Sequence, residues 1–349
     1  MSEELLLIVI KISLTVLFVL WGSIAYSLYY RRKRGKQLQE IEMTFANIVS
    51  RYLYPEPNKP INLIEIQRKL RAAGIKPGKK SNVQFLIFLL IRTQRNILGK
   101  NHRKLQVLYK QIPPFRASIT KLQKKSWYAK ASGIREIYEM NQGQHLPEIF
   151  PLRNHPNIYV RREAQIAMVV FLGWESLRFL PYLKRNVTLW QQIKIVEKLY
   201  DHYKEPNLFY LRKSYGAEKD FARQLIIRII RKYELMSEIG YVLKHLDSEN
   251  HEVREAAIYC IQNFRLNNPE VEVIKNILPK IPNTSQKRQL LNYISANSEI
   301  DLIFYKKLLH DSNDVIKLKT AQILWENGYK ETVQEFYYEQ YSKTLEYAE

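Results

Sequence analysis

The sequence predicts an all-α protein in which a single N-terminal transmembrane helix is followed by an α-solenoid of helix pairs. Three observations support this prediction: residues 5–30 are almost continuously apolar, the 349 residues include only 11 glycines, and an apolar–cationic dyad recurs with a period of about 31 residues. A long apolar run is typical of a membrane span. Few glycines argue against a turn-rich or sheet-rich fold, and a repeat of 20–50 residues is typical of stacked helix pairs.

The predicted transmembrane helix covers residues 5–30, after a short extracytoplasmic tail at residues 1–4. This run is long enough, because crossing a hydrocarbon layer about 30 Å thick needs about 20 helical residues. A cleaved signal peptide would need a basic start and a shorter apolar stretch, whereas Glu3 and Glu4 precede this one. Lys11 lies near the outer end, where a long side chain reaches the headgroups.

Five cations directly after the span set its expected orientation. They are Arg31, Arg32, Lys33, Arg34 and Lys36. By the positive-inside rule, the end of a span that carries such cations lies in the cytoplasm. We therefore expect a single-pass inner (plasma) membrane protein with its N-terminus outside and the bulk of the chain cytoplasmic. Cys260 is the only cysteine, which excludes a disulfide framework within the chain and suits a reducing cytoplasm.

The net charge of +21 is concentrated next to the span. Residues 37–125 carry 18 cations and 4 acids, whereas residues 126–349 carry 31 cations and 28 acids. An anionic leaflet attracts each nearby Lys or Arg by about 1 kcal/mol, so a basic segment tied to that leaflet needs no nucleic acid to explain it. A cationic surface that serves only solubility is the other interpretation.

The segment after the span is expected to be helical and basic. Residues 31–61 are expected to form a juxtamembrane amphipathic helix and a proline-rich linker, because apolar residues recur every three or four positions from Leu38 to Tyr52 before Pro55 and Pro57. A basic helical module is expected over residues 62–114. Its helices are predicted at 62–73, 82–98 and 101–112, with Pro113 and Pro114 closing the module.

A repeat fills residues 115–345. A small or branched apolar residue followed by a cation recurs at Ala129-Lys130, Val160-Arg161, Ala222-Arg223, Val253-Arg254 and Ile316-Lys317. The spacings equal one or two periods, so seven units of two helices fit, with the missing phases near Gln191 and Ser285. The clearest turns are rich in Asp, Asn and Ser, which favour helix starts. Gly173 and Gly328 follow second helices, where a C-terminal cap favours glycine.

One unit carries the pattern most clearly. Asp247 lies in the turn, Val253-Arg254 forms the dyad, and Ala256-Ala257 supplies small residues after it. In this pattern the chain resembles the HEAT repeat family, particularly its short repeats of about thirty residues. Partial matches include Asn157, Asp220 and Asp311. The resemblance implies a solenoid and no particular activity. It also implies that the dyad cations bond neighbouring repeats or bind a partner: Lys130, Arg161, Arg223, Arg254 and Lys317.

No motif predicts catalysis, a cofactor or a metal site. Gly74 and Gly78 miss the P-loop spacing, and His251-Glu252 lacks the second histidine of a zinc-protease helix. No Gly-x-Ser-x-Gly elbow is present and the histidines are scattered. We therefore expect that the protein is not an enzyme and uses no cofactor. A lyase-like or other enzyme on a HEAT-like scaffold is the hypothesis that opposes this expectation.

The expected function is that of a membrane-anchored cytoplasmic scaffold or adaptor that binds a protein partner at the inner membrane face. The partner is expected to be membrane-associated, for example an envelope biosynthesis enzyme in a bacterial assembly. The alternative is nucleic-acid or polyanion binding through residues 62–125, with nucleic acid the less favoured partner. Phe336, Tyr337, Tyr338 and Tyr341 are expected to cap the array or to dock a partner. Contact with anionic lipid headgroups is expected from Arg31, Arg32, Lys33, Arg34, Lys36, Lys100, Arg103, Lys104 and Lys110.

Overall fold

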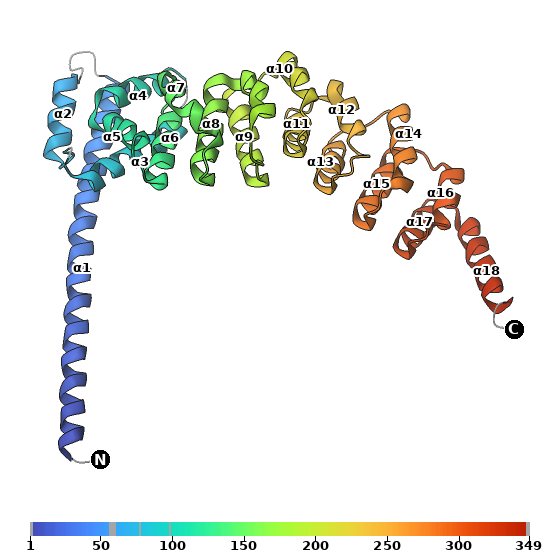
Figure 1. Cartoon of the computed structure of the whole chain (residues 1–349), viewed down its shortest axis with the longest axis horizontal. Coiled ribbons are helices and arrows are strands. Elements are labelled where there is room, and N and C mark those ends of the chain that lie inside the picture. The colour runs from blue at the N-terminus through green and yellow to red at the C-terminus, as the bar shows by residue number, and fades with distance from the viewer. Residues whose placement is uncertain (1–2, 56–60, 77, 98, 347–349) are drawn as a thin grey trace. The chain divides into compact units, whose positions relative to one another are not determined.

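The computed structural model describes residues 3–55, 61–76, 78–97 and 99–346, and these residues form helices and turns with no β-strand (Figure 1). The predicted all-α class is therefore confirmed. The chain divides into two compact units, unit 1 (Met1–Ala167) and unit 2 (Met168–Glu349). The division falls inside α8 (Ile158–Leu172).

Unit 1 is built around α1 (Glu3–Leu53), a single helix of 51 residues. Its described apolar side chains up to Tyr30 are exposed, and this part is long and apolar enough to cross a membrane. Among the described residues no other helix meets that criterion. Further along, Ile41, Phe45 and Ile48 of the same helix are buried in the protein core. The helix predicted after the span is thus confirmed, and it continues from the span without a break.

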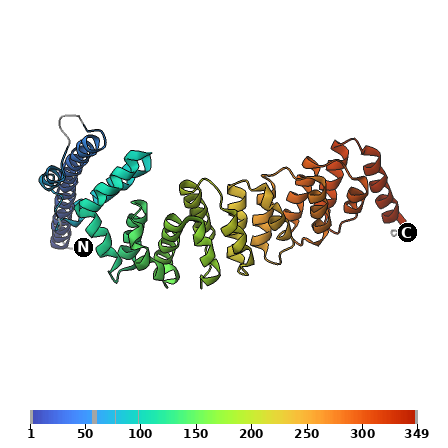
Figure 2. The ribbon, with the colours of Figure 1, turned by 90° about the horizontal axis from the view of Figure 1, so that it is seen from above.

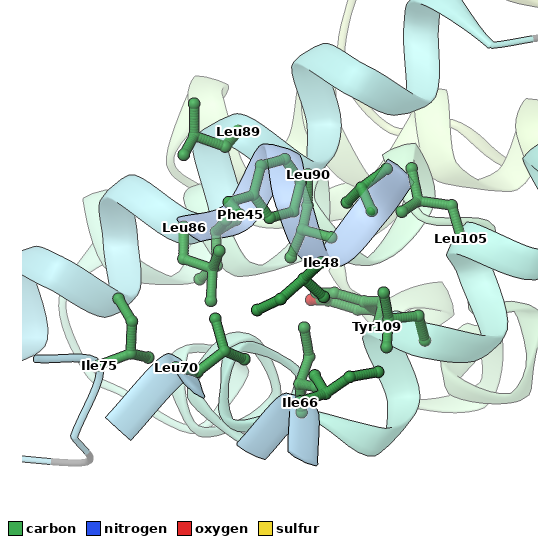
Figure 3. Close-up of a cluster of buried hydrophobic side chains, with 14 of the residues drawn as sticks. Phe45, Ile48, Ile66, Leu70, Ile75, Leu86, Leu89, Leu90, Leu105 and Tyr109 are labelled. Atoms are coloured by element: carbon green, nitrogen blue, oxygen red, sulfur yellow. The ribbon is translucent and has the colours of Figure 1, made fainter. Parts of the chain in front are cut away.

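The core of unit 1 joins α1 to α2 (Leu63–Ala72), α3 (Lys80–Asn96) and α4 (Lys100–Gln111). Figure 3 shows Ile48 of α1 among Ile66, Leu90 and Tyr109, all of them almost fully buried. Burying a large apolar side chain contributes about 1.5–3 kcal/mol to folding. The three helices predicted for the basic module are confirmed, each to within two residues of its expected ends.

α3 runs in the same direction as α1. Near its start, Ser81 Oγ accepts a hydrogen bond of 3.2 Å from Arg34, just beyond the apolar run. Further along both helices, Arg92 lies 3.7 Å from Glu42. The start of α3 therefore lies at the end of unit 1 that is nearer the apolar run.

The packing of unit 1 continues past residue 114, where the sequence placed the end of the basic module. Pro113 and Pro114 begin α5 (Pro113–Leu122) rather than only ending α4. The Tyr109 hydroxyl of α4 donates to Ser118 Oγ of α5 at 2.7 Å. Gly133 of α6 (Trp127–Glu139) lies so close to α5 that a Cβ there would meet the Ser118 carbonyl oxygen at 2.8 Å. The first helix pair belongs to unit 1 because these contacts join it to α4.

The rest of the chain alternates short elements with longer second helices. In unit 1 the further elements are η1 (Gly143–His145), α7 (Leu146–Ile149) and η2 (Phe150–Asn154). In unit 2 they are η3 (Gly173–Tyr182), α9 (Leu189–His202), α10 (Leu208–Lys213), η4 (Ser214–Gly216), α11 (Asp220–Lys232), η5 (Met236–Glu238), α12 (Ile239–Lys244), α13 (His251–Ile261), α14 (Asn268–Ile277), η6 (Leu278–Lys280), α15 (Thr284–Asn297), α16 (Leu302–Leu309), α17 (Asp314–Glu326) and α18 (Lys330–Glu346).

The second helices begin at regular intervals. α6, α8, α9, α11, α13, α15 and α17 start every 30 to 33 residues, and the two phases that lack the dyad, at Gln191 and Ser285, fall in α9 and α15. Asn250 and Asn283 cap α13 and α15 by accepting hydrogen bonds from backbone N–H groups of the first turn. In unit 2, each of the helices α9, α11, α13, α15 and α17 contacts the next (Figure 2).

Gly173 and Gly328 have the positive φ that their predicted capping role requires, at +56° and +90°. Gly173 is also constrained by a neighbour, because a Cβ there would lie 2.7 Å from Cζ of Tyr203. The Tyr203 hydroxyl donates to the Val170 carbonyl at 3.0 Å. The ring is therefore held against a position where only glycine fits.

Candidate functional site

The cations that follow the apolar run have two different environments. Arg34 is half-buried, donates to Gln37 at 2.8 Å and to Ser81 at 3.2 Å, and also bonds Asn82. This arginine joins α1 to the start of α3. The other four are exposed and lie at the end of the apolar run: Arg31, Arg32, Lys33 and Lys36.

The α4 cations lie at the opposite end of the buried part of α1. Lys104 Nζ donates to the carbonyl oxygen of Leu53 at 3.3 Å. Leu53 follows Arg34 by 19 residues, which is about 28 Å along a helix that rises 1.5 Å per residue. Lys104 therefore does not share the level of Arg31–Lys36 along α1, as contact with one headgroup layer requires. The expectation that both groups contact one headgroup layer did not take into account the length of α1 that lies between them. The exposed α4 cations of that prediction are Lys100, Arg103, Lys104 and Lys110.

A basic groove of about 680 Å³ lies between α2, α3 and α5. Its floor includes the buried side chains of Leu70, Val83 and Ile87. No carboxylate is among the described residues that line it, and of its described cations Lys121 pairs with a carboxylate, the buried Glu136 behind the lining. A groove with uncompensated cations attracts anions. Its six cations are Arg71, Lys80, Lys110, Arg116, Lys121 and Lys124.

One signal in the sequence marks this basic region more sharply than the segment charges do. Between Glu65 and Glu136 there is no aspartate or glutamate. The acid-free stretch covers most of α2, all of α3, α4 and α5, and the first part of α6. The charge count over residues 37–125 does not show this acid-free stretch, because that range includes acids of α1 that lie outside the groove.

Arg161 and Arg254 make the same contacts in two different repeats. Arg254 Nη1 donates to the carbonyl oxygens of Ser248 and Glu249 at 2.6 and 3.0 Å. Arg161 Nη1 donates to the carbonyl oxygens six and five residues earlier, at 2.8 and 3.2 Å. Both arginines are buried. Arg254 Nε also donates to Gln286 of the next repeat at 3.1 Å.

The other three predicted ladder residues differ from these two. Arg223 pairs with Asp220 at 3.3 Å, and Lys317 pairs with Asp314 at 3.0 Å, each within its own helix and partly exposed. Lys130 is half-buried in α6. The five dyad cations therefore do not share one role. Arg161 and Arg254 are the two that bond the carbonyl oxygens of the turn before their own helix.

Uncharged amides, which the repeat pattern did not predict, supply further bonds between successive second helices. Gln192 Nε2 donates to Gln224 Oε1 at 2.9 Å, and Gln224 Nε2 donates to Glu252 at 3.1 Å. Near the other end of unit 2, Asn313 Nδ2 donates to Thr284 Oγ1 at 2.9 Å. These residues lie in or beside the first turns of their helices. In the sequence, these bonds are indicated only by polar residues spaced about one repeat period apart.

Tyrosine hydroxyls form a second row of bonds in unit 2. Tyr233 donates to the carbonyl of Tyr203 at 2.6 Å, and Tyr293 donates to the carbonyl of Phe264 at 2.8 Å. Tyr203 donates in the same way to the carbonyl of Val170 in α8, which also lies in unit 2. Burial raises the pKa of Tyr203, Tyr233 and Tyr293, so these hydroxyls stay protonated donors near neutral pH.

Among the described residues, no group of three or more His, Cys, Asp and Glu side chains could hold a metal ion. Burial raises the pKa of the Cys260 thiol to about 12, which leaves it a poor nucleophile. The hydrogen bond from Arg212 holds the pKa of Glu238 below its usual value. A general base needs a pKa nearer the working pH.

A groove of about 540 Å³ lies between α17 and α18. Trp325, Tyr337 and Tyr338 line it and are exposed. Phe336 points elsewhere, is buried, and packs edge-on against His310 with ring centroids 5.0 Å apart. The structure thus divides the C-terminal aromatics: Phe336 covers the preceding repeat, whereas Tyr337 and Tyr338 face a groove. The side chain of Tyr341 lies outside the described residues.

A comparison with protein-family models found no match to this chain, and a comparison with curated proteins found none either. The contacts described above are therefore the basis for assigning a function.

Proposed function

We propose that the chain is a single-pass membrane protein with its N-terminus outside, whose cytoplasmic helical units act as a scaffold for a protein partner. The observation that carries this proposal is the continuity of α1. One helix leads from an exposed apolar segment into the core of unit 1, so the span and the body share one element. The exposed cations from Arg31 to Lys36 follow the span, as the positive-inside rule expects of the cytoplasmic side. Headgroup contact is assigned to these residues and not to α4.

The helix pairs are proposed to form a HEAT-like solenoid. The regular starts of the second helices support this arrangement, as do the contacts of each second helix in unit 2 with the next. Arg161 and Arg254 repeat the same bonds to turn carbonyls. A solenoid presents an extended surface to a partner. Tethering that partner at a membrane raises its effective concentration without chemistry.

The partner is proposed to bind the groove between α17 and α18. Trp and Tyr are enriched among the residues that dominate binding energy at protein interfaces, and Trp325, Tyr337 and Tyr338 line this groove. A membrane-associated protein, such as an envelope biosynthesis enzyme, fits a scaffold held at the membrane.

In-cell photocrosslinking tests the scaffold proposal. A photoreactive phenylalanine analogue would replace Tyr338 in the full chain, and Phe209, another exposed aromatic residue, would carry the same group as a control. We expect one membrane protein to be captured from position 338 and not from position 209, and to be lost when Trp325→Ala is added. Equal capture from both positions, or none from either, contradicts partner binding at this groove.

A second candidate function is polyanion binding in the basic groove, which the absence of carboxylates from its described lining favours. In neutral-lipid nanodiscs, the full chain would be titrated with fluorescent single-stranded and duplex nucleic acid at several salt concentrations. Binding through six cations predicts a steep loss of affinity with salt. The double variant Lys110→Glu/Arg116→Glu should make that slope clearly shallower, because it reverses two of the six cations. Arg103→Glu with Lys100→Glu, outside the groove, should preserve it. Affinity that is weak and unchanged by either variant rejects this function.

A further inference from the structure

Exposed apolar residues gather at the starts of α6 and α8 in unit 1. Trp127, Tyr128 and Tyr159 are 45%, 70% and 46% exposed, and Ile158 is 42% exposed. The rings of Trp127 and Tyr159 stack with centroids 5.0 Å apart and planes 22° apart. We call these four residues the aromatic edge. An exposed apolar cluster of this kind is typical of a surface that contacts another phase or molecule.

The aromatic edge lies at the end of unit 1 that is nearer the apolar run of α1. α3 begins beside Arg34, and Gln84 in its second turn bonds Lys121 at the end of α5. At the other end of α3, Arg95 donates to Glu139 at 2.7 Å, at the end of α6. α6 therefore runs in the same direction as α3 and α1, and its first residues lie on the side of the span. Figure 1 shows α1 leaving unit 1 on one side only.

The level of the edge along α6 follows from two contacts. A Cβ on Gly133 would lie 2.8 Å from the Lys121 Cβ, and Lys121 bonds Gln84. Gln84 also donates directly to Glu136 of α6 at 3.1 Å. Gln84 is thus near the level of residues 133–136, which follow Trp127 by six to nine positions, or about 9–14 Å at 1.5 Å per residue. The edge therefore lies about 9–14 Å closer to the side of the span than Gln84 does.

The same reckoning applies to α1. Asn82, which bonds Arg34, precedes Gln84 by two residues, or about 3 Å. A level about 9–14 Å below Gln84 is then about 6–11 Å below Arg34, which is about four to seven residues of α1. That level corresponds to residues 27–30, the last turn of the apolar run. Trp127 therefore lies at about the height of that last turn.

The charge around the edge is one-sided. Lys124 and Lys125 are exposed just before Trp127, within the acid-free stretch. The nearest acids beyond it on these helices are buried: Glu136 accepts a bond from Ser118 at 2.6 Å, and Glu163 pairs with Arg162. Trp and Tyr favour the boundary between hydrocarbon and water, and Lys favours anionic headgroups.

We propose that the aromatic edge lies in the headgroup layer of the leaflet that α1 leaves, with Lys124 and Lys125 against anionic lipids. This inference rests on the proposed membrane anchor and adds a second contact between unit 1 and the same leaflet. The span and the edge then hold unit 1 at two points, which fixes its orientation above the membrane. A single point would leave it free to rotate about α1.

Depth-dependent quenching of single fluorescent labels tests the proposal on the full chain in liposomes that contain phosphatidylglycerol. Labels go on cysteines introduced by Gln123→Cys beside the edge, Val107→Cys on the distant α4, and Phe18→Cys in the span. Cys260 is buried with a thiol pKa of about 12, so it reacts poorly with the label. With a quencher at headgroup depth, the Gln123→Cys label should lose most of its emission and the Val107→Cys label almost none.

Each outcome decides between the two proposals. Quenchers placed among the lipid acyl chains should quench the Phe18→Cys label. If they do, but the headgroup quencher affects the Gln123→Cys label as little as the Val107→Cys label, the membrane anchor stands and the inference about the aromatic edge is overturned. The edge would then be left to contact a protein. No quenching at position 18 overturns both. As a charge test, Lys124→Glu/Lys125→Glu should reduce quenching at position 123 in anionic liposomes, whereas Lys124→Arg/Lys125→Arg should retain it. Equal quenching in both pairs argues against contact with anionic headgroups.

Discussion

Unit 1 and unit 2 are both helical, yet they differ in charge and in how they are held together. Unit 1 carries 29 cations and 10 acids, whereas unit 2 carries 26 cations and 24 acids. The core of unit 1 joins residues far apart in the sequence around α1, such as Ile48 and Tyr109. In unit 2 each second helix contacts its neighbours in the repeat, and the polar bonds link positions about one period apart.

This difference shows what each unit needs from its sequence. Excess positive charge repels itself and destabilises a compact state, so unit 1 requires a strong apolar core to keep its basic groove and exposed lysines. Unit 2 balances its charges and spreads its stability over many local contacts. A change in one repeat of unit 2 should therefore act mainly on that repeat and its neighbours.

The largest expected effect breaks the packing between second helices. Ala257 in α13 is fully buried, so Ala257→Glu would place an unpaired carboxylate in the core. We expect a loss of about 3–5 kcal/mol in the free energy of unfolding, measured by urea denaturation. The matched control is Ala296→Glu on the exposed side of α15, which should change stability by less than about 0.5 kcal/mol. Similar losses in both variants would show that the assigned repeat phase is incorrect.

The next effect separates two residues that the repeat pattern treats as equivalent. Arg254→Met removes two bonds to turn carbonyls and one to Gln286 from a buried site. Bonds that involve a charged group contribute about 1.5–3 kcal/mol, so we expect a loss of about 3 kcal/mol. Arg223→Met removes only a partly exposed pair with Asp220, typically worth less than about 1 kcal/mol. Equal losses in thermal unfolding would restore a common role for the dyad cations.

Much of the fold follows from local patterns in the sequence. The apolar run, the amphipathic spacing after it and the repeat of the dyad each depend on residues close along the chain. For that reason the helices of the basic module are confirmed to within two residues of their expected ends. The end of the basic module was less predictable. Pro113 both ends one helix and begins another, and only the contact between Tyr109 and Ser118 shows that the packing continues.

The candidate surfaces depend on which end of unit 1 each helix presents, and a charge count does not contain that information. Lys104 and Lys124 look alike in the sequence, yet one lies beside Leu53 and the other follows the end of α5 next to the aromatic edge. Trp127 and Tyr159 occupy first-turn positions 32 residues apart, which suggests core packing as readily as exposure. Their proposed position in the headgroup layer can be inferred only because α3 contacts both α1 and α6.

The third prediction tests a contact between repeats through a glycine. Gly173→Ala combines a positive φ with a methyl group 2.7 Å from the Tyr203 ring, and we expect a loss of about 1–3 kcal/mol. Gly328→Ala is the matched control, because its φ is also positive but nothing lies within 4 Å of its Cβ position. Thermal unfolding should therefore show a larger loss at position 173 than at 328. The reverse order would mean that Tyr203 does not hold its bond to Val170 in solution.

The smallest expected effect concerns pH and lies within unit 2. Arg212 and the Tyr215 hydroxyl both bond Glu238, each at 2.6 Å, and the bond from Arg212 lowers the Glu238 pKa. A carboxyl whose pKa is lower in the folded state stabilises the fold above its unfolded pKa of about 4.3. That stabilisation is lost as the pH falls through the folded pKa. Urea midpoints measured from neutral pH down to acid should therefore fall less steeply in Glu238→Gln than in the parent chain. Arg212→Met should flatten the profile in part, because the bond from Tyr215 to Glu238 remains, and the double variant should match Glu238→Gln. An unaltered profile in all three would mean that solvent screens this pair completely.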